Sequence, residues 1–203
     1  TRLNYAENLL AGAGAAATDT AIFFADEGGA RQQISWSNLR SRVARVAALL
    51  EDEGIGPGDV VAGFLPNTPD AVIAMLATTS LGAVWTSTSP DFGADAVVER
   101  FGQVRPRLLF ATSSARYAGK TMDLRPVLQR LRAGLPSLQR ILLVGEELET
   151  AERAHCARVE PRFRRMPFNA PLFVLYSSGT TGKPKCIVHG IGGSLLQHVK
   201  EHR

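Results

Sequence analysis

The sequence predicts an α/β fold with layered architecture, in which a mostly parallel sheet is flanked by helices. Two observations lead to this prediction. Short, continuously apolar runs recur along most of the chain, and helix-like segments of about ten residues separate them. Parallel strands need crossover connections of this kind, and strands that are covered on both faces read as continuous apolar runs.

Residues 1–35 are expected to form an opening segment and a β-hairpin. Residues 21–26 (AIFFAD) and 32–35 flank the glycine-containing turn 27–30, which is typical of a hairpin. Apolar residues then recur at helical spacing between a candidate N-cap, Ser35, and a stop, Gly54. They are Trp36, Leu39, Val43, Val46 and Leu50.

Residues 36–144 are predicted to be an α/β unit, of which this amphipathic helix is the first element. Apolar runs predict strands at residues 60–65, 83–86, 108–111 and 141–144. Helical patterns separate them at residues 70–81, 94–104 and 124–133.

Residues 145–171 turn polar, with glutamates before arginines, and are interpreted as a solvated connection with a short helix near Ala151. Residues 172–203 are expected to form a strand, a loop, a second apolar strand and the start of a helix. In this segment Cys186 is predicted to be a core residue, and His198 to lie on a helix surface.

Composition restricts the class of protein. With 203 residues, 45% of them hydrophobic, the chain can bury the core of one domain. Its 23 basic and 19 acidic residues leave a charge of +4 without a long basic run, which favours phosphate ligands weakly and gives no support for nucleic acid. Cys156 and Cys186 form no CxxC pair, so neither a disulfide framework nor a zinc site is indicated, and a cytoplasmic location is expected.

No membrane span is expected, because no apolar run approaches the roughly 20 residues that a membrane helix needs. The first residues, TRLNYAENLL, lack the features of a signal peptide and look like a start within a longer protein.

The most informative stretch is LFVLYSSGTTGKPKCIVHG, residues 172–190, in which a strand runs into a loop rich in Ser, Thr, Gly and Lys. Glycines let the backbone approach a ligand, hydroxyls and N–H groups donate hydrogen bonds to phosphate, and lysines add charge. The candidate phosphate-binding residues are Ser177, Ser178, Gly179, Thr180, Thr181, Gly182, Lys183 and Lys185. The spacing does not match a Walker A loop, which disfavours a P-loop ATPase or GTPase. On composition alone, a flexible surface turn is the alternative.

The string YSSGTTGKPK resembles the phosphate-binding signature of the AMP-forming adenylating enzymes, and the resemblance extends over essentially the whole chain. Within that superfamily, three stretches are similar to acetoacetyl-CoA synthetases, with acetyl- and propionyl-CoA synthetases as the main rivals. These stretches are LNYAENLL (3–10), SPDFG (89–93) and CIVHGIGGSLLQHVKEH (186–202).

The resemblance implies an acid–thiol ligase that uses ATP, Mg²⁺ and coenzyme A to activate acetoacetate through an acyl-adenylate. It also implies that the chain is the N-terminal part of such an enzyme and inactive alone, with the rest of the polypeptide as its partner. The family's adenine-binding, metal-binding and ribose-binding residues and its catalytic lysine should then follow Arg203, so no catalytic or metal-ligating residue is assigned within the chain. The alternatives are another short-chain acyl-CoA synthetase, or a nucleotide-binding or interaction module without turnover.

A second candidate site lies at residues 115–120, where acetyl-CoA synthetases carry an Arg-x-Gly-Arg element that contacts the coenzyme A nucleotide. Arg116, Tyr117 and Lys120 are the candidates implied by this resemblance. Lys120 matches the second arginine only as a cation, and Tyr117 replaces the first. A solvated loop is the alternative, because lysine cannot make the bidentate phosphate contact of arginine.

Overall fold

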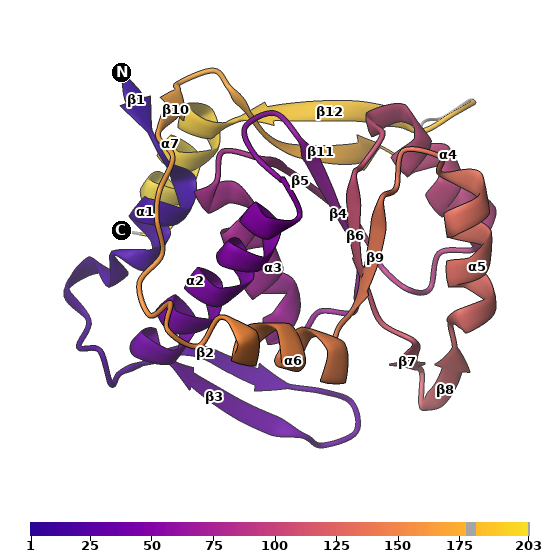
Figure 1. Cartoon of the computed structure of the whole chain (residues 1–203), viewed down its shortest axis with the longest axis horizontal. Helices are drawn as coiled ribbons and strands as arrows, with labels where there is room; N and C mark the ends of the chain where they lie inside the picture. Colours follow the sequence, from indigo (N-terminus) through magenta and orange to yellow (C-terminus); the bar gives the residue numbers. More distant parts are fainter. Residues whose placement is uncertain (178–181, 203) are drawn as a thin grey trace.

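The computed structural model describes residues 1–177 and 182–202. Its centre is a six-stranded sheet with the order β12-β11-β5-β4-β6-β9 (Figure 1). Neighbouring strands run parallel from β11 to β9, whereas β12 runs antiparallel to β11. The prediction of a mostly parallel sheet is confirmed. The strands are β4 (Val60–Phe64), β5 (Val84–Thr88), β6 (Leu108–Ala111), β9 (Arg140–Leu143), β11 (Pro171–Ser177) and β12 (Lys185–Gly190).

Helices cover both faces of the sheet, with one pair on either side in Figure 1. One pair is α2 (Trp36–Asp52) and α3 (Pro69–Ser80), and the other is α4 (Ala94–Val104) and α5 (Arg125–Gly134). The predicted alternation of strands and helices is confirmed to within a few residues at each boundary.

Strand β6 shows why these strands are apolar at every position. Leu108 and Phe110 belong to the core beneath α2 and α3, while Leu109 and Ala111 belong to the core beneath α4 and α5. Successive side chains of a strand point to opposite faces, so a strand covered twice needs an apolar residue at each position.

Helix α2 begins and ends where its sequence predicts. Asn38 donates its backbone N–H to Oγ of Ser35 at 3.2 Å, which satisfies one of the free donors of the first turn. Past the other end, Gly54 has a φ of 70°, which lets the chain leave the helix. Val43 and Leu50 are completely buried, and each side chain of this kind contributes about 1.5–3 kcal/mol when buried.

Three two-stranded ladders lie outside the main sheet. Strands β2 (Thr20–Ala25) and β3 (Arg31–Ser35) form the predicted hairpin. Strands β7 (Ser114–Tyr117) and β8 (Lys120–Asp123) form a second hairpin, which the sequence did not predict. Strands β1 (Arg2–Leu3) and β10 (Met166–Pro167) pair the beginning of the chain with the segment before β11.

The polar connection contains α6 (Glu146–Ala154), close to the expected helix near Ala151. The interpretation of the whole connection as solvated was wrong, because one side of α6 is buried. Glu152 is only 7% exposed and accepts a hydrogen bond from Arg42 Nη2 at 2.7 Å. Arg42 also pairs with Asp70 at 2.8 Å. These ion pairs join α6 to α2 and α3, and no local sequence pattern indicates them because the partners lie far apart along the chain.

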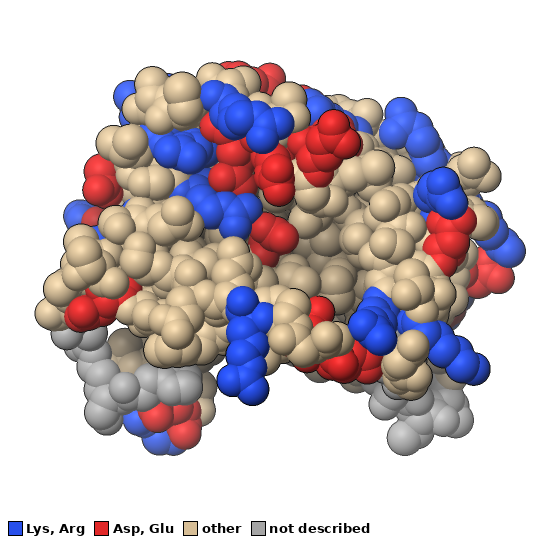
Figure 2. Space-filling model, turned by 90° about the horizontal axis from the view of Figure 1, so that it is seen from below, with Lys and Arg blue, Asp and Glu red and all other residues tan. Residues whose placement is uncertain are grey.

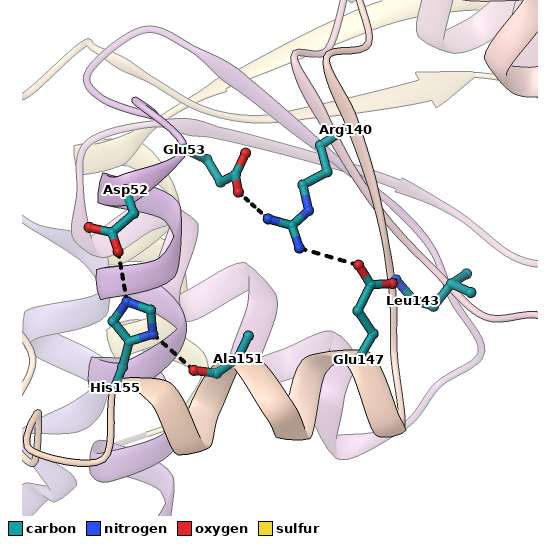
Figure 3. A network of polar contacts seen from close by, with 7 residues as sticks. All are labelled: Asp52, Glu53, Arg140, Leu143, Glu147, Ala151 and His155. Atoms are coloured by element: carbon teal, nitrogen blue, oxygen red, sulfur yellow. Dashed lines mark hydrogen bonds and ion pairs between the residues drawn. The ribbon is translucent and has the colours of Figure 1, made fainter.

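Helix α6 also protects the edge of the sheet at β9 (Figure 3). Glu147 accepts a hydrogen bond from the backbone N–H of Leu143 at 2.8 Å and another from Arg140 Nη2 at 3.2 Å. Arg140 is held in turn by Glu53 at the end of α2. An edge strand exposes backbone groups that another strand could pair with, so a carboxylate that occupies one of them protects this edge.

Large apolar side chains are exposed on β11, β12 and the following helix, α7 (Ile191–His202). Leu175 and Ile187 pair directly across the β11–β12 ladder, so they share one face of the sheet, and they are 47% and 46% exposed. We call these two residues the apolar face. Val188, 59% exposed, lies on the opposite face of β12. The prediction that Cys186 is a core residue was wrong, since its side chain is only partly buried. The next two residues of β12, Ile187 and Val188, are also not covered by any of the described segments.

Helix α7 is tied to the first helix, α1 (Tyr5–Leu10), which lies beside it in Figure 1. The hydroxyl of Tyr5 lies 2.8 Å from Nδ1 of His198, and the Tyr5 ring contacts Phe173 of β11 edge-on at 5.2 Å. Burial raises the pKa of Tyr5 to about 12. His198 thus lies on a helix as predicted, and its partly buried ring also contacts Tyr5, which the sequence did not indicate.

The face shown in Figure 2 carries Lys and Arg side chains intermixed with Asp and Glu. Side chains of opposite charge also form ion pairs on the surface. Arg130 Nη2, for example, lies 2.5 Å from Oδ1 of Asp95. None of the described helices has both the length and the hydropathy to cross a membrane.

Candidate functional site

The motif that the sequence predicts to bind phosphate lies between β11 and β12, and β12 is the edge strand of the sheet. Ser177 is the last residue of β11 and pairs across the ladder with Lys185, the first residue of β12. Strand β11 runs parallel to β5, so the connection follows the carboxyl end of a parallel strand. Ligands of open α/β sheets bind outside the carboxyl ends of the strands, which makes this connection a candidate phosphate site.

Four of the predicted phosphate-binding residues, Ser178, Gly179, Thr180 and Thr181, lie outside the described residues. The remaining four flank that stretch: Ser177, Gly182, Lys183 and Lys185. Both lysine side chains are exposed, so their ammonium groups are accessible to an anion. Gly182 has a φ of 104°, a conformation that residues with a side chain rarely adopt, so glycine is needed at this point of the motif.

The strand that leads into the motif is fixed by Tyr176, a residue that the sequence analysis did not select. Thr86 of β5 donates its hydroxyl to the carbonyl of Val174 at 2.7 Å, and its Oγ1 lies 2.9 Å from the Tyr176 hydroxyl. Because a threonine hydroxyl has one proton, Tyr176 donates in the second bond. Burial raises the pKa of Tyr176 to about 12, so this donor stays protonated at neutral pH.

The residues of the second candidate site form the β7–β8 hairpin. Ala118 and Gly119 form its turn with φ values of 50° and 75°, as two-residue hairpin turns of type I′ require. Tyr117 pairs with Lys120, and Arg116 pairs with Thr121. Directly paired residues share a face, so Arg116 and Lys120 lie on opposite faces of the hairpin. The side chain of Tyr117 lies outside what the structure describes.

The tip of this hairpin contacts the β2–β3 hairpin. Gly119 donates its backbone N–H to Oε1 of Glu27 at 3.3 Å. A Cβ added to Gly28 would lie 2.7 Å from Nη1 of Arg116, so the guanidinium lies directly over that glycine. Arg116 therefore lies against the β2–β3 hairpin. Arg116 and Lys120 are both exposed, and neither takes part in an ion pair among the described residues.

The structure does not bring the two candidate sites together. In Figure 1 the β7–β8 hairpin lies at the lower right, whereas the ends of β11 and β12 that flank the motif lie at the upper right, next to α4. If both sites take part in substrate binding, each site binds a different group of the substrates. Two sequence signals could have identified the hairpin: the Ala-Gly pair, and the short strand-like runs on either side of it.

Together, the three-layer fold and the phosphate motif define an AMP-binding enzyme, and the chain belongs to that family. The family model "AMP-binding enzyme" matches residues 12–203. Within the family, the chain is 42% identical to the acetoacetyl-CoA synthetase of Mus musculus, covering 100% of this chain and 33% of that protein. It is also 42% identical to a malonamoyl-CoA synthetase of Penicillium aethiopicum, covering 99% of this chain and 31% of that protein.

A solved structure supports the same assignment. The acetoacetyl-CoA synthetase from Streptomyces lividans superposes with a TM-score of 0.91 at 43% sequence identity, covering 98% of this chain and 32% of that one. The fold is therefore that of part of an AMP-forming ligase. The chain spans about a third of the length of the relatives it matches.

Proposed function

We propose that the protein to which this chain belongs activates acetoacetate with ATP and transfers the acyl group to coenzyme A. An oxygen of the acetoacetate carboxylate attacks the α-phosphorus of ATP, the bond to pyrophosphate breaks, and an acyl-adenylate forms. The coenzyme A thiolate then attacks the acyl carbon and AMP leaves. The observation that carries the proposal is the phosphate motif at the carboxyl end of β11, in a chain 42–43% identical to acetoacetyl-CoA synthetases over its length.

In this proposal, the motif stabilises the departing pyrophosphate. Negative charge accumulates on the β- and γ-phosphates as the bond to the α-phosphorus breaks. Donors and cations fixed before the reaction stabilise that charge without reorganising. Ser177 is the last residue of β11 and Lys185 is the first residue of β12, and the two pair across the ladder. They are therefore the most rigidly placed of the described candidates.

We propose a class of acyl substrate, short carboxylates with a carbonyl at the third carbon, and within it acetoacetate as the preferred acid. The chain is as similar to a malonamoyl-CoA synthetase as to an acetoacetyl-CoA synthetase, so overall identity in this third of the protein does not distinguish the two acids. Acetoacetate and malonamate are both short carboxylates with a carbonyl at the third carbon. We propose this class, with acetoacetate first, over acetate and propionate.

The remaining substrates follow the same proposal. Coenzyme A is proposed to place a phosphate near the β7–β8 hairpin, with Lys120 as the contact, Tyr117 paired with it across the ladder and Arg116 on the other face. Mg²⁺ is proposed to enter bound to ATP phosphates, as is usual for this ion. The described residues contain no group of three His, Cys, Asp or Glu side chains that could hold a metal, so no side chain is assigned to it. We propose that the protein acts in the cytoplasm.

The experiment is an acid-dependent ATP–pyrophosphate exchange assay on the full-length protein. Acetoacetate, malonamate, acetate and propionate are compared at equal concentration with ATP and Mg²⁺, and thioester formation is measured after coenzyme A is added. Exchange with acetoacetate or malonamate well above that with acetate supports the proposed class. Preference for acetate or propionate contradicts the class, and the absence of exchange with any of the acids contradicts the proposed reaction.

A further inference from the structure

We propose that Gln103, on the last turn of α4, is a positioning residue that holds the exit of the phosphate motif in place. This inference rests on the proposed function. Nε2 of Gln103 donates to the backbone carbonyl of Pro184 at 3.0 Å. Pro184 lies between Lys183 and Lys185 in the motif and is buried, whereas both lysines are exposed. Gln103 therefore fixes the backbone from which both cations project.

The geometry of Gln103 is itself restrained. Its Nε2 also donates to the carbonyl of Glu99 at 3.1 Å, one turn earlier on α4. The amide thus bridges the helix and the motif, and both of its N–H groups have partners. Arg105 follows the helix with a φ of 53°, a left-handed conformation that ends α4 at Val104, so Gln103 lies at its C-terminal end.

The same turn of α4 supports the strand that enters the motif. Phe101 is completely buried and its ring lies 6.3 Å from that of Tyr176, the residue before Ser177. Tyr176 is fixed further by Thr86, so the entry to the motif has two supports. Two residues of one helical turn, Phe101 and Gln103, therefore contact the two sides of the motif.

The exit needs this support more than the entry does. Strand β12 is the edge of the described sheet, and it has an exposed apolar side chain on each face, Ile187 on one and Val188 on the other. Among the described residues, Gln103 makes the one side-chain hydrogen bond recorded to residues 182–185. A donor set that stabilises charge in the transition state must be held within a fraction of an ångström, so loss of this bond should reduce rate more than substrate binding.

The test uses the full-length protein with Gln103→Met, which keeps length and helix propensity but removes the donor. The loss of one hydrogen bond of this kind corresponds to roughly a fivefold change in a rate or equilibrium constant. We expect kcat for acetoacetate-dependent pyrophosphate exchange to fall by about that factor while the KM for acetoacetate stays unchanged. Gln103→Arg, which restores N–H donors at similar length, should recover most of the rate. Gln129→Met, an exposed glutamine on α5, is the matched control and should behave like the wild type.

A second measurement does not depend on activity. Backbone amide exchange in the β11–β12 ladder should be faster in Gln103→Met, and exchange in β4 and β6 should be unchanged. Unchanged exchange in the ladder, or a kcat equal to that of the wild type, overturns the positioning role. If the wild type shows no acid-dependent exchange of pyrophosphate, the proposed function fails, and the amide exchange result alone decides whether Gln103 holds the motif.

Discussion

The imidazole of His155 lies between two hydrogen-bond acceptors: its Nε2 is 2.9 Å from Oδ2 of Asp52, and its Nδ1 is 2.9 Å from the carbonyl of Ala151 (Figure 3). Both contacts are hydrogen bonds only when both ring nitrogens carry a proton. The Ala151 carbonyl and the Asp52 carboxylate therefore raise the pKa of His155, while burial and Arg158 oppose them. The charged ring joins the C-terminal end of α6 to the last turn of α2.

The first prediction concerns the pH dependence of this contact. Because the pKa of folded His155 is raised, its stabilisation is fully present below the unfolded value of about 6.5 and is lost as pH rises through the folded pKa. His155→Gln should reduce the free energy of unfolding more near pH 5.5 than near pH 8.5, by up to about 1 kcal/mol for a partly exposed pair. Denaturant titrations at both pH values measure this. An NMR titration that places the pKa of His155 at or below 6.5 would contradict it.

The second prediction concerns Arg42, whose guanidinium pairs with Glu152 and Asp70. Arg42→Ala should lower the free energy of unfolding by about 3 kcal/mol, because it leaves a mostly buried carboxylate without a partner. Arg130→Ala breaks an ion pair whose side chains are 65% and 85% exposed and should cost under about 1 kcal/mol. Chemical denaturation of both variants measures the difference. Equal effects would mean that the Arg42 pairs contribute no more than a surface pair.

The third prediction concerns Lys185 and the chemical step. In the full-length protein, Lys185→Ala should lower the rate of adenylate formation by about two orders of magnitude, the scale for removing one preorganised charge-stabilising donor. Lys200→Ala, which removes an exposed cation of α7, is the control and should have no such effect. Pyrophosphate release measures the rate. A rate unchanged by Lys185→Ala would remove Lys185 from the proposed site.

The fourth prediction concerns Lys120 and coenzyme A. Lys120→Ala in the full-length protein should raise the KM for coenzyme A by roughly fivefold, since an exposed charge pair contributes at most about 1 kcal/mol. Adenylate formation should be nearly unchanged, because the β7–β8 hairpin lies away from the phosphate motif. Arg132→Ala, an exposed cation on α5, serves as the control. A parallel rise in the KM for ATP would indicate a folding defect and not a coenzyme A contact.

The fifth prediction concerns the 203-residue chain by itself. We expect no acetoacetate-dependent pyrophosphate release, because one phosphate motif cannot supply the positioning that a complete site provides. We also expect concentration-dependent association through the apolar face. Leu175→Thr with Ile187→Thr should weaken that association in sedimentation experiments, whereas Phe23→Thr, at a position 76% exposed on β2, should not. Turnover by the chain alone would contradict the first expectation.

The sequence predicted most of the fold because local patterns determined it. Strand β6 and helix α4 were predicted with the boundaries that the structure has. Each was predicted from a pattern, an apolar run or a helical stripe, whose residues lie close together in the sequence. The cap at Ser35 was predicted for the same reason. The phosphate motif could be found because all of its candidate residues are contiguous, although what each of them contacts remains a proposal.

Only the tertiary structure decided which distant residues support that motif and which surfaces stay uncovered. Nothing local to Gln103 marks it as a partner of Pro184, and nothing local to Glu152 marks it as the buried partner of Arg42. The sequence could not show that Cys186 is only partly buried, because a strand pattern does not reveal whether a layer covers it. These properties depend on contacts between segments that the chain brings together only on folding, whereas sequence periodicity reports what each segment does alone.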